Sequence, residues 1–330
     1  MRLVVSDMIN SSQDITVVDT AENGLEAVDK TKLLQPDVVL LDLTMKDYDG
    51  MYAIRNIMLH RPTPIVILSS LGNSQPQAVF EALDHGACDF INKPEGIVGS
   101  RIRDVEQYLF SKLRYAAQIE LSTLKRSGLQ TNNSAHTFGQ MQFEVLGIGA
   151  STGGTSAVEY LLTHLPSNLP IPIVIAQHMP EGFIYSFAER LNTLVPFTVK
   201  VAQSNEVVLP NTAYLLPCDS NLELKKRLGK TMFQINSARF REYNFPSVDC
   251  LFSSLSQVYG RRAIGVLLTG MGRDGASGLL DMSTAGGYTI AQDKASSVVF
   301  GMPKAAIELG AARRELALTQ MPPYIVSLLD

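Results

Sequence analysis

The sequence lacks the features that would define a secreted, membrane or nucleic-acid-binding protein. Its three cysteines, Cys88, Cys218 and Cys250, are odd in number and widely spaced, so neither a disulfide framework nor a zinc site is expected, and a reducing cytoplasm fits. No apolar run reaches the ~18 residues that a membrane span needs, and the first residues, MRLVVSDMIN, show no signal-peptide pattern. The net charge of −4 and the lack of a dense basic block argue against nucleic-acid binding.

What the sequence does have is a repeated alternation of strand and helix patterns. A chain of 330 residues with 45% hydrophobic content is long enough for two domains with buried cores. In the first part, short apolar stretches predict buried strands at 14–21, 36–43, 63–70 and 88–93. Helical periodicity lies between them, for example at 23–34, and a long helix is predicted from Arg101. This order predicts a parallel sheet with crossover helices.

A polar segment separates this part from a second α/β region. The stretch KRSGLQTNNSAHTFGQ, residues 125–140, has the composition of a linker. Further strands are predicted after it at 170–178, 263–270 and 287–293. We therefore expect a first domain at 1–124, a linker at 125–142 and a second, mostly parallel α/β domain at 143–330.

The glycine-rich stretch VLGIGASTGG, residues 145–154, has two possible interpretations. A dinucleotide fingerprint G-x-G-x-x-G needs glycine where Thr152 stands, and it needs an acidic residue where the next strand ends in Gln177. The stretch from Gly149 to Gly153 instead satisfies G-x-S-x-G, a sharp strand-to-helix turn that exposes Ser151 at the sheet edge. An idle serine in such a turn is the competing interpretation.

A nucleophilic serine needs a nearby base, and His178 is the best-placed histidine. It stands at the carboxyl end of the next strand, where open α/β sheets gather their sites, although a lone histidine there is more often structural. His164 would lie ~20 Å along the helix that follows Ser151. The remaining histidines lie in helices of the first domain or in the linker (His60, His85 and His136).

A third group must orient the imidazole, and Asp274 stands at another strand end. It lies in the loop of AIGVLLTGMGRDGASG, between an apolar strand and a helix. It could simply cap that helix. Serine, histidine and aspartate at three successive strand ends nevertheless match a catalytic triad, which is recognised by geometry rather than chain order.

Several blocks together resemble the chemotaxis response-regulator protein-glutamate methylesterases. They are GIGASTGGTSAVEYLL, IAQHMPEGFIYSFAERLN, FPSVDCLFSSL, VLLTGMGRDGASGLL and VVFGMPKAAIELGA. The resemblance covers nearly the whole chain. It implies a flavodoxin-like receiver domain followed by a doubly wound, mostly parallel catalytic domain.

The resemblance also implies an activity and its residues. The expected reaction is hydrolysis of glutamate γ-methyl esters on chemoreceptors with release of methanol, and in some members deamidation of receptor glutamines. The nucleophile falls on Ser151, the base on His178 and the orienting acid on Asp274, with the backbone N–H of Met271 as candidate oxyanion donor. No cofactor is expected for catalysis. Arg273 replaces the asparagine usual in that loop, and we expect its side chain to point outward.

By the same resemblance, the first domain carries a phosphorylation site. Asp42 ends its strand where receivers accept a phosphoryl group from a chemotaxis histidine kinase, with Mg²⁺ bound beside it. Ser69 would be the switch hydroxyl, Phe90 the switch aromatic, and Lys93 the partner of the phosphoryl oxygens. Lys46 stands where the family has proline.

The first receiver strand, which ends in a metal-binding acidic pair, has no counterpart in this sequence. Residues 1–18 resemble the first helix and the start of the second strand. In the flavodoxin-like order 2-1-3-4-5 the missing strand is interior. Asp7 is poorly placed to replace the acidic pair, so we expect only a partial Mg²⁺ site at Asp42 and impaired phosphorylation. Either Met1 is an internal methionine of a longer protein, which we favour, or the receiver is degenerate.

Two other classes of function compete with the esterase. One is a receiver-linked regulator whose second domain only binds partners; the three polar strand ends argue against it. The other is a nucleotide-dependent enzyme, which Thr152 and the missing ribose-binding acid disfavour. We also expect a monomer.

Overall fold

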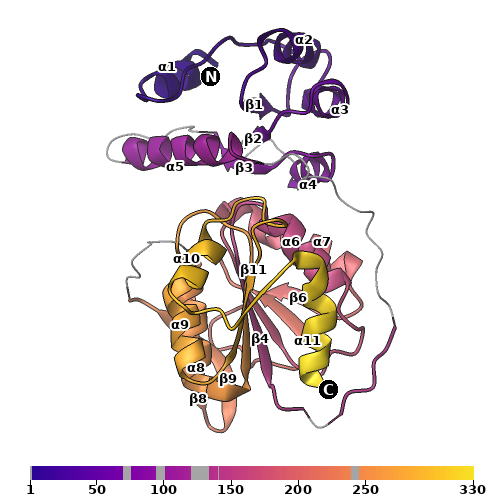
Figure 1. Ribbon diagram of the computed structural model, residues 1–330, viewed down its shortest axis with the longest axis vertical. Coiled ribbons are helices and arrows are strands. Elements are labelled where there is room, and N and C mark those ends of the chain that lie inside the picture. Colours follow the sequence, from indigo (N-terminus) through magenta and orange to yellow (C-terminus); the bar gives the residue numbers. More distant parts are fainter. Residues whose placement is uncertain (1, 70–75, 94–100, 120–133, 140, 239–244) are drawn as a thin grey trace. The chain divides into compact units, whose positions relative to one another are not determined.

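The computed structural model describes residues 2–69, 76–93, 101–119, 134–139, 141–238 and 245–330. The chain divides into two compact units, Met1–Arg126 and Ser127–Asp330, each with its own sheet and helices (Figure 1). Among the described residues, no helix is both long and apolar enough to cross a membrane.

The first unit holds a three-stranded parallel sheet in the order β1-β2-β3. Its strands are β1 Val39–Asp42, β2 Ile65–Ser69 and β3 Asp89–Asn92. Its helices are α1 Arg2–Asn10, α2 Gly24–Leu34, α3 Gly50–His60, α4 Pro76–Asp84 and α5 Arg101–Ala116. The middle strand β2 is buried at every position, as expected for a parallel strand covered by helices on both faces. The predicted parallel sheet is confirmed.

The strand predicted at 14–21 is wrong. The segment has no ladder hydrogen bonds, and Val18 within it is 61% exposed. An extended segment becomes a strand only beside a paired neighbour, because its N–H and C=O groups otherwise bond to water. Among the described residues, no strand pairs with β1 on the edge away from β2. This agrees with the expectation that the interior first strand of a flavodoxin-like sheet has no counterpart here.

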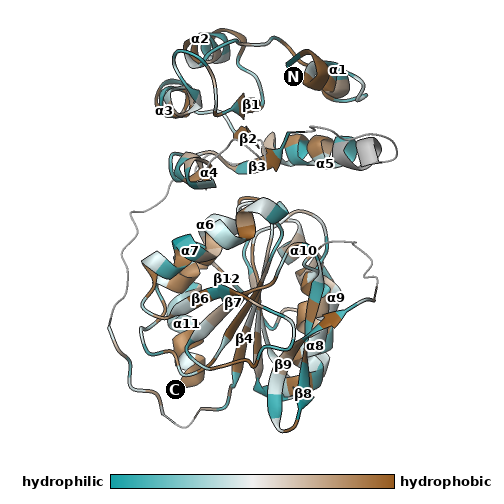
Figure 2. Ribbon diagram, turned by 180° about the vertical axis from the view of Figure 1, so that it is seen from behind, coloured by the Kyte–Doolittle hydropathy of each residue, from teal (hydrophilic) through white to brown (hydrophobic). Residues whose placement is uncertain are grey.

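The second unit is built on a seven-stranded parallel sheet in the order β12-β11-β10-β4-β5-β7-β6. Its strands are β4 Val145–Ala150, β5 Ile173–Gln177, β6 Thr198–Val201, β7 Thr212–Leu215, β10 Ala263–Leu267, β11 Tyr288–Gln292 and β12 Arg314–Leu316. All residues of β4, β5, β10 and β11 are buried. Figure 2 shows the hydrophobic residues concentrated in β4 and its neighbours.

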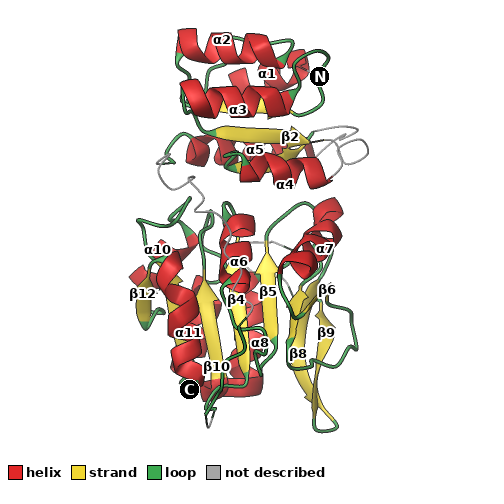
Figure 3. Cartoon of the chain, turned by 90° about the vertical axis from the view of Figure 1, so that its right-hand side faces the viewer, coloured by secondary structure: helices red, strands yellow, loops and turns green. Residues whose placement is uncertain are grey.

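Helices cover both faces of this sheet, so the predicted doubly wound fold is confirmed (Figure 3). One face carries α6 Gly154–Thr163, α7 Ile184–Leu194 and α11 Met321–Leu329. The other carries α8 Val248–Tyr259, α9 Ala276–Thr284 and α10 Met302–Glu308. The short 3₁₀ helices are η2 Glu181–Phe183, η3 Gly260–Arg262 and η4 Leu318–Gln320. A separate antiparallel hairpin, β8 Asn221–Arg227 with β9 Lys230–Asn236, was not predicted.

The strand order reverses at β4, and this reversal positions the site. On one side of β4 the sheet continues with β5, β7 and β6. On its other side lie β10, β11 and β12, which come later in the chain. In open α/β sheets a crevice forms at such a switch point, outside the carboxyl ends of the strands. The loops after β4, β5 and β10 meet there.

Candidate active site

The three polar residues predicted at strand ends lie at the switch point. Ser151 directly follows β4, His178 directly follows β5, and Asp274 lies in the loop between β10 and α9. The register pairs Ala150 with Gln177, so Ser151 and His178 leave the sheet side by side. The N–H of His178 also donates to the carbonyl of Ala150 at 3.0 Å.

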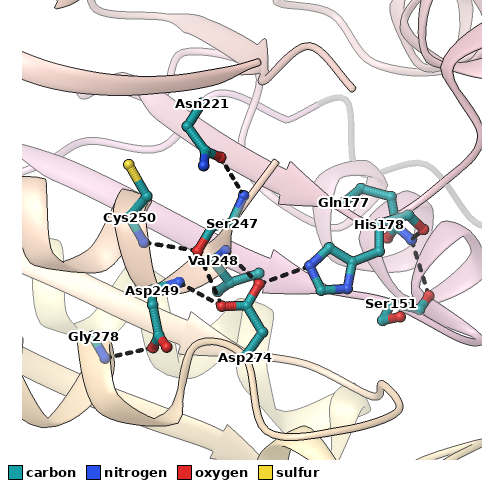
Figure 4. A network of polar contacts seen from close by, with 10 residues as sticks. All are labelled: Ser151, Gln177, His178, Asn221, Ser247, Val248, Asp249, Cys250, Asp274 and Gly278. Atoms are coloured by element: carbon teal, nitrogen blue, oxygen red, sulfur yellow. Dashed lines mark hydrogen bonds and ion pairs between the residues drawn. The ribbon is translucent and has the colours of Figure 1, made fainter. Parts of the chain in front are cut away.

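His178 and Asp274 are hydrogen-bonded in the structure. The distance from His178 Nε2 to Asp274 Oδ2 is 2.8 Å, and the two side chains are 12% and 1% exposed. Figure 4 shows the imidazole between the carboxylate of Asp274 and Ser151, with the second ring nitrogen, Nδ1, on the side of Ser151. The arrangement has the order serine, imidazole, carboxylate that nucleophilic hydrolases require.

Both oxygens of Asp274 are held by the first turn of α8. Oδ2 accepts from the N–H of Val248 at 2.8 Å, and Oδ1 accepts from the N–H of Asp249 at 3.0 Å and from the hydroxyl of Ser247 at 3.2 Å. Burial alone would raise the pKa of Asp274. The bond from His178 and these backbone donors outweigh burial and hold the pKa below its usual range. Asp274 is therefore an ionised carboxylate that bonds His178 and the first turn of α8, while the N-cap of its own helix α9 is Gly275.

The turn that carries Ser151 is tight because of its glycines. Gly153 has φ 74°, a left-handed conformation that glycine adopts without strain. The N–H of Gly154 donates to the carbonyl of Ser151 at 2.8 Å. Ser151 itself is 6% exposed, and its hydroxyl makes no hydrogen bond to another described residue. That hydroxyl is thus available to the imidazole or to a substrate.

Gln177, the last residue of β5, ties the two strand ends together. Its side chain is buried, and its Nε2 donates to the carbonyl oxygens of Ser151 at 2.9 Å and of His178 at 2.8 Å. Its Oε1 is buried without a hydrogen-bond partner among the described residues. One side chain thus fixes the two peptides that carry the candidate nucleophile and base.

The loop after β10 approaches Ser151 closely. A Cβ at Gly270 would lie 2.8 Å from the Ser151 Cβ and 2.3 Å from the Met302 sulfur, so only glycine fits. The N–H of Met271 donates to no other described residue, which leaves it available to an oxyanion. Arg273 is exposed, and the expectation that it points outward is confirmed.

Sequence reasoning missed the residues that support the triad. Ser247 stands before an apolar helical run, an N-cap pattern that could have been recognised. Asn221, whose Oδ1 accepts from the Ser247 N–H at 2.6 Å, carries no such signal because it lies on the unpredicted hairpin. Gln177 was read only as the absence of a ribose-binding acid. Of the other histidines, His164 caps the far end of α6, as expected.

Of the predicted phosphorylation residues, Asp42 and Lys93 are in contact at strand ends of the first unit. Lys93 Nζ lies 2.6 Å from Asp42 Oδ2, and the N–H of Thr44 donates to Asp42 Oδ1 at 3.0 Å. Ser69 ends β2, and its buried Oγ has no partner in the part of the chain described. Phe90 on β3 is buried.

The described residues do not supply a complete magnesium site at Asp42. Both of its oxygens are engaged, and no group of three or more acidic, histidine or cysteine side chains that could hold a metal occurs among them. Asp7 lies exposed on α1. Mg²⁺ prefers several oxygen ligands including carboxylates, and no group of three such side chains lies around Asp42 in the described part of the chain.

Fold and sites together define a class: a response-regulator receiver joined to a doubly wound α/β effector domain. Comparison with known proteins agrees. Residues 146–325 match the family described as CheB methylesterase, and residues 1–99 match the response regulator receiver domain. The chain belongs to the CheB methylesterase family.

Relatives match nearly the whole chain. This chain is 40% identical to a protein-glutamate methylesterase/protein-glutamine glutaminase of Salmonella typhi, and the alignment covers 99% of this chain and 93% of the relative. The protein of the same name from Thermotoga maritima is 38% identical, over 99% and 95%. The crystal structure of the Thermotoga maritima CheB methylesterase catalytic domain superposes with a TM-score of 0.55 at 39% identity, covering 56% of this chain and 98% of that one.

Proposed function

We propose that this protein hydrolyses glutamate γ-methyl esters on the cytoplasmic region of chemoreceptors and releases methanol. Ser151 is the nucleophile and His178 the general base and acid. Asp274 orients the imidazole and stabilises its protonated form. The observation that carries the proposal is the 2.8 Å bond between His178 and Asp274 at the strand end beside Ser151. A partner-binding regulator would have no use for a buried, ionised Asp274 hydrogen-bonded to a histidine next to a glycine-framed serine.

The first half-reaction forms an acyl-enzyme. Because Nε2 of His178 bonds Asp274, Nδ1 takes the proton as Ser151 Oγ attacks the ester carbonyl carbon. The N–H of Met271 and the N-terminal end of α6 stabilise the resulting oxyanion. The intermediate then expels methanol, which receives the proton from His178, and a glutamyl ester of Ser151 remains.

The second half-reaction regenerates the serine. Water attacks the acyl carbonyl while His178 takes its proton, and the proton then passes to the Ser151 oxygen as the glutamate carboxylate leaves. A glutamine side chain at the same site loses ammonia in place of methanol, in keeping with the double name of the relatives. Neither half-reaction uses a cofactor.

Methanol release from methylated receptor membranes tests the proposal. We expect Ser151→Ala to fold normally and to lose nearly all turnover. His178→Ala and Asp274→Asn should each lower kcat by about 10²-fold or more. Asp281→Asn, an exposed carboxylate of α9, is the matched control and should keep wild-type turnover. Wild-type turnover by Ser151→Ala would eliminate the serine mechanism.

The first unit regulates the second through Asp42. In this proposal a chemotaxis histidine kinase supplies the phosphoryl group, Lys93 contacts its oxygens, and Ser69 and Phe90 respond as switch residues. Their geometry supports this: Lys93 already pairs with Asp42, and the unpartnered Ser69 hydroxyl ends the neighbouring strand. The boundaries 1–124, 125–142 and 143–330, a cytoplasmic location and a monomeric state belong to the same proposal.

Magnesium neutralises charge during phosphoryl transfer in receivers, and the described residues of this chain offer it few ligands. Since no group of three or more metal-ligating side chains surrounds Asp42 among the described residues, we expect weak Mg²⁺ binding and poor phosphorylation by a small phosphodonor. Labelling with acetyl phosphate, with Asp42→Asn as the blank, measures this. Efficient Mg²⁺-dependent labelling of Asp42 would contradict it.

A further inference from the structure

Two acidic side chains exchange helix caps behind the triad. Asp274, just before α9, accepts hydrogen bonds from the first turn of α8 through the N–H groups of Val248 and Asp249. Asp249, in the first turn of α8, reaches in the opposite direction: its Oδ1 accepts from the N–H of Gly278 in the first turn of α9 at 2.7 Å. Each helix is thus capped by a carboxylate from the other, and one of these is the triad acid (Figure 4).

The two helices meet too closely for this exchange to be loose. A Cβ at Gly278 would lie 2.7 Å from the carbonyl oxygen of Asp249 and 2.9 Å from its Cα. Asp249 is 8% exposed. The carboxylate of Asp249 is therefore fixed relative to Asp274. The backbone N–H of Asp249 also donates to Asp274 Oδ1.

Asp249 carries a charge that the hydrolytic steps do not use. The carboxylates that face it are Asp274, from the loop before α9, and Asp281, on α9; His178 lies beyond Asp274. Burial raises the pKa of Asp249 to about 6, and the two carboxylates act in the same direction against the bonds from the Gly278 and Gly275 N–H groups. The group therefore titrates in the range in which a catalytic histidine works.

We propose that Asp249 is a positioning residue of the active site: its cap on α9 holds Asp274 in place, and its charge, acting through Asp274, strengthens His178 as a base. This inference rests on the proposed triad and adds a fourth residue to it. The two effects separate by substitution. Asparagine at 249 keeps an oxygen acceptor for the Gly278 N–H and removes the charge, whereas alanine removes both.

The charge is tested by the pH profile of kcat/KM for methanol release, whose acid limb reports the base of the free enzyme. Loss of a buried negative charge disfavours the imidazolium. We expect Asp249→Asn to move the acid limb about half a pH unit to lower pH and to leave the kcat plateau within about twofold. Asp281→Asn, the same change on the exposed side of the pair, should leave the limb in place. A superimposable Asp249→Asn profile, or an equal shift in Asp281→Asn, overturns the charge effect.

The cap is tested by the split between kcat and KM. A triad that loses its fixed geometry loses turnover rather than binding. We expect Asp249→Ala to lower kcat about tenfold, leave KM within about twofold, and be largely rescued in Asp249→Asn. Equal kcat losses in the two variants, or none in Asp249→Ala, would overturn the cap. If Asp249→Ala fails to fold, the acid limb of kcat/KM in Asp249→Asn alone decides whether Asp249 acts on His178.

A second readout separates this inference from the proposed function. The His178 ring signal of the 330-residue protein, assigned by its loss in His178→Asn, can be followed by NMR without any substrate. Its titration midpoint should move to lower pH in Asp249→Asn by the same half unit. Absence of methanol release by the wild type would refute the esterase, while an unmoved midpoint would refute the role of Asp249.

Discussion

At the scale of single residues, the geometry of the candidate site depends on buried side chains that hold the backbone of Ser151 and His178. Gln177 is the clearest case, because it bonds both the Ser151 and the His178 carbonyl groups. Replacing it by an apolar side chain of similar length leaves two carbonyls without that donor. An unpaired buried polar group costs about 1–3 kcal/mol.

We therefore expect Gln177→Met to lower kcat about tenfold through misalignment of the nucleophile and base. Gln292→Met is the matched control: Gln292 is also a buried glutamine at a strand end, but its side chain bonds Thr269 and Ser296 instead. Both variants should lose thermal stability to a similar extent, measured by Tm. An equal loss of kcat in both would show that Gln177 acts only through stability.

Asp249 also affects stability in a direction that is unusual for a carboxylate. Its pKa is raised from 3.8 in the unfolded chain to about 6 in the fold, so the native state binds the extra proton between these values. The contribution of Asp249 to the free energy of unfolding therefore falls as pH rises from about 4 to 6 and stays lower above pH 6. The charged form is the one that the fold disfavours.

At pH 7.5 the free energy of unfolding of Asp249→Asn should accordingly be about 1–3 kcal/mol higher than that of the wild type. The difference should be much smaller at pH 4, where the native wild-type carboxyl is protonated and the unfolded one, with its pKa of 3.8, is only partly ionised. Urea unfolding at the two pH values measures it. A variant less stable than the wild type at pH 7.5 would mean that the ionised cap contributes more than its burial costs.

At the scale of elements, the contact between α8 and α9 fixes the carboxylate of the triad. The Gly278 backbone lies against the Asp249 backbone, where no side chain can move aside. We expect Gly278→Ala to separate the helices, destabilise the protein by about 1–3 kcal/mol, and reduce kcat more than KM. Thr284→Ala, at an exposed position of the same helix, should change neither. Circular dichroism melts and methanol release together measure both effects.

The elements also show what a sequence can predict. Strand and helix alternation identified the three strands of the first sheet and the central strands β4, β5, β10 and β11 of the second, because apolar runs between helices are local signals. The outer strands β6, β7 and β12 were not predicted. The strand expected at 14–21 failed because strand formation depends on a neighbour, which the segment itself does not encode. Ser151, His178 and Asp274 could be found as strand-end residues, whereas the bonds of Asn221, Ser247 and Gln177 depend on packing between distant segments. The Ser151–His178–Asp274 assignment itself stays a prediction until the variants are measured.

At the scale of the whole molecule, the proposed regulation involves the two compact units of the chain. If the unphosphorylated first unit hinders access of the receptor to the candidate active site, residues 142–330 alone should hydrolyse methyl esters faster than the full chain. The solved catalytic domain of the Thermotoga maritima relative covers 56% of this chain. Methanol release by the two proteins at equal concentration measures it. Equal or lower activity of the short chain would exclude steric masking.

The switch-point sheet has a further consequence for how activity returns after denaturation. Serine and histidine come from one wing of the sheet and the aspartate from the other, and the His178–Asp274 bond joins residues 96 positions apart. Contacts of such long range close late, since the loop entropy is lost before they form. A refolding chain should regain its helical signal before it regains turnover. If Ser151, His178 and Asp274 form the proposed triad, a partly folded chain should therefore be inactive, because the triad is complete only when both halves of the sheet have formed.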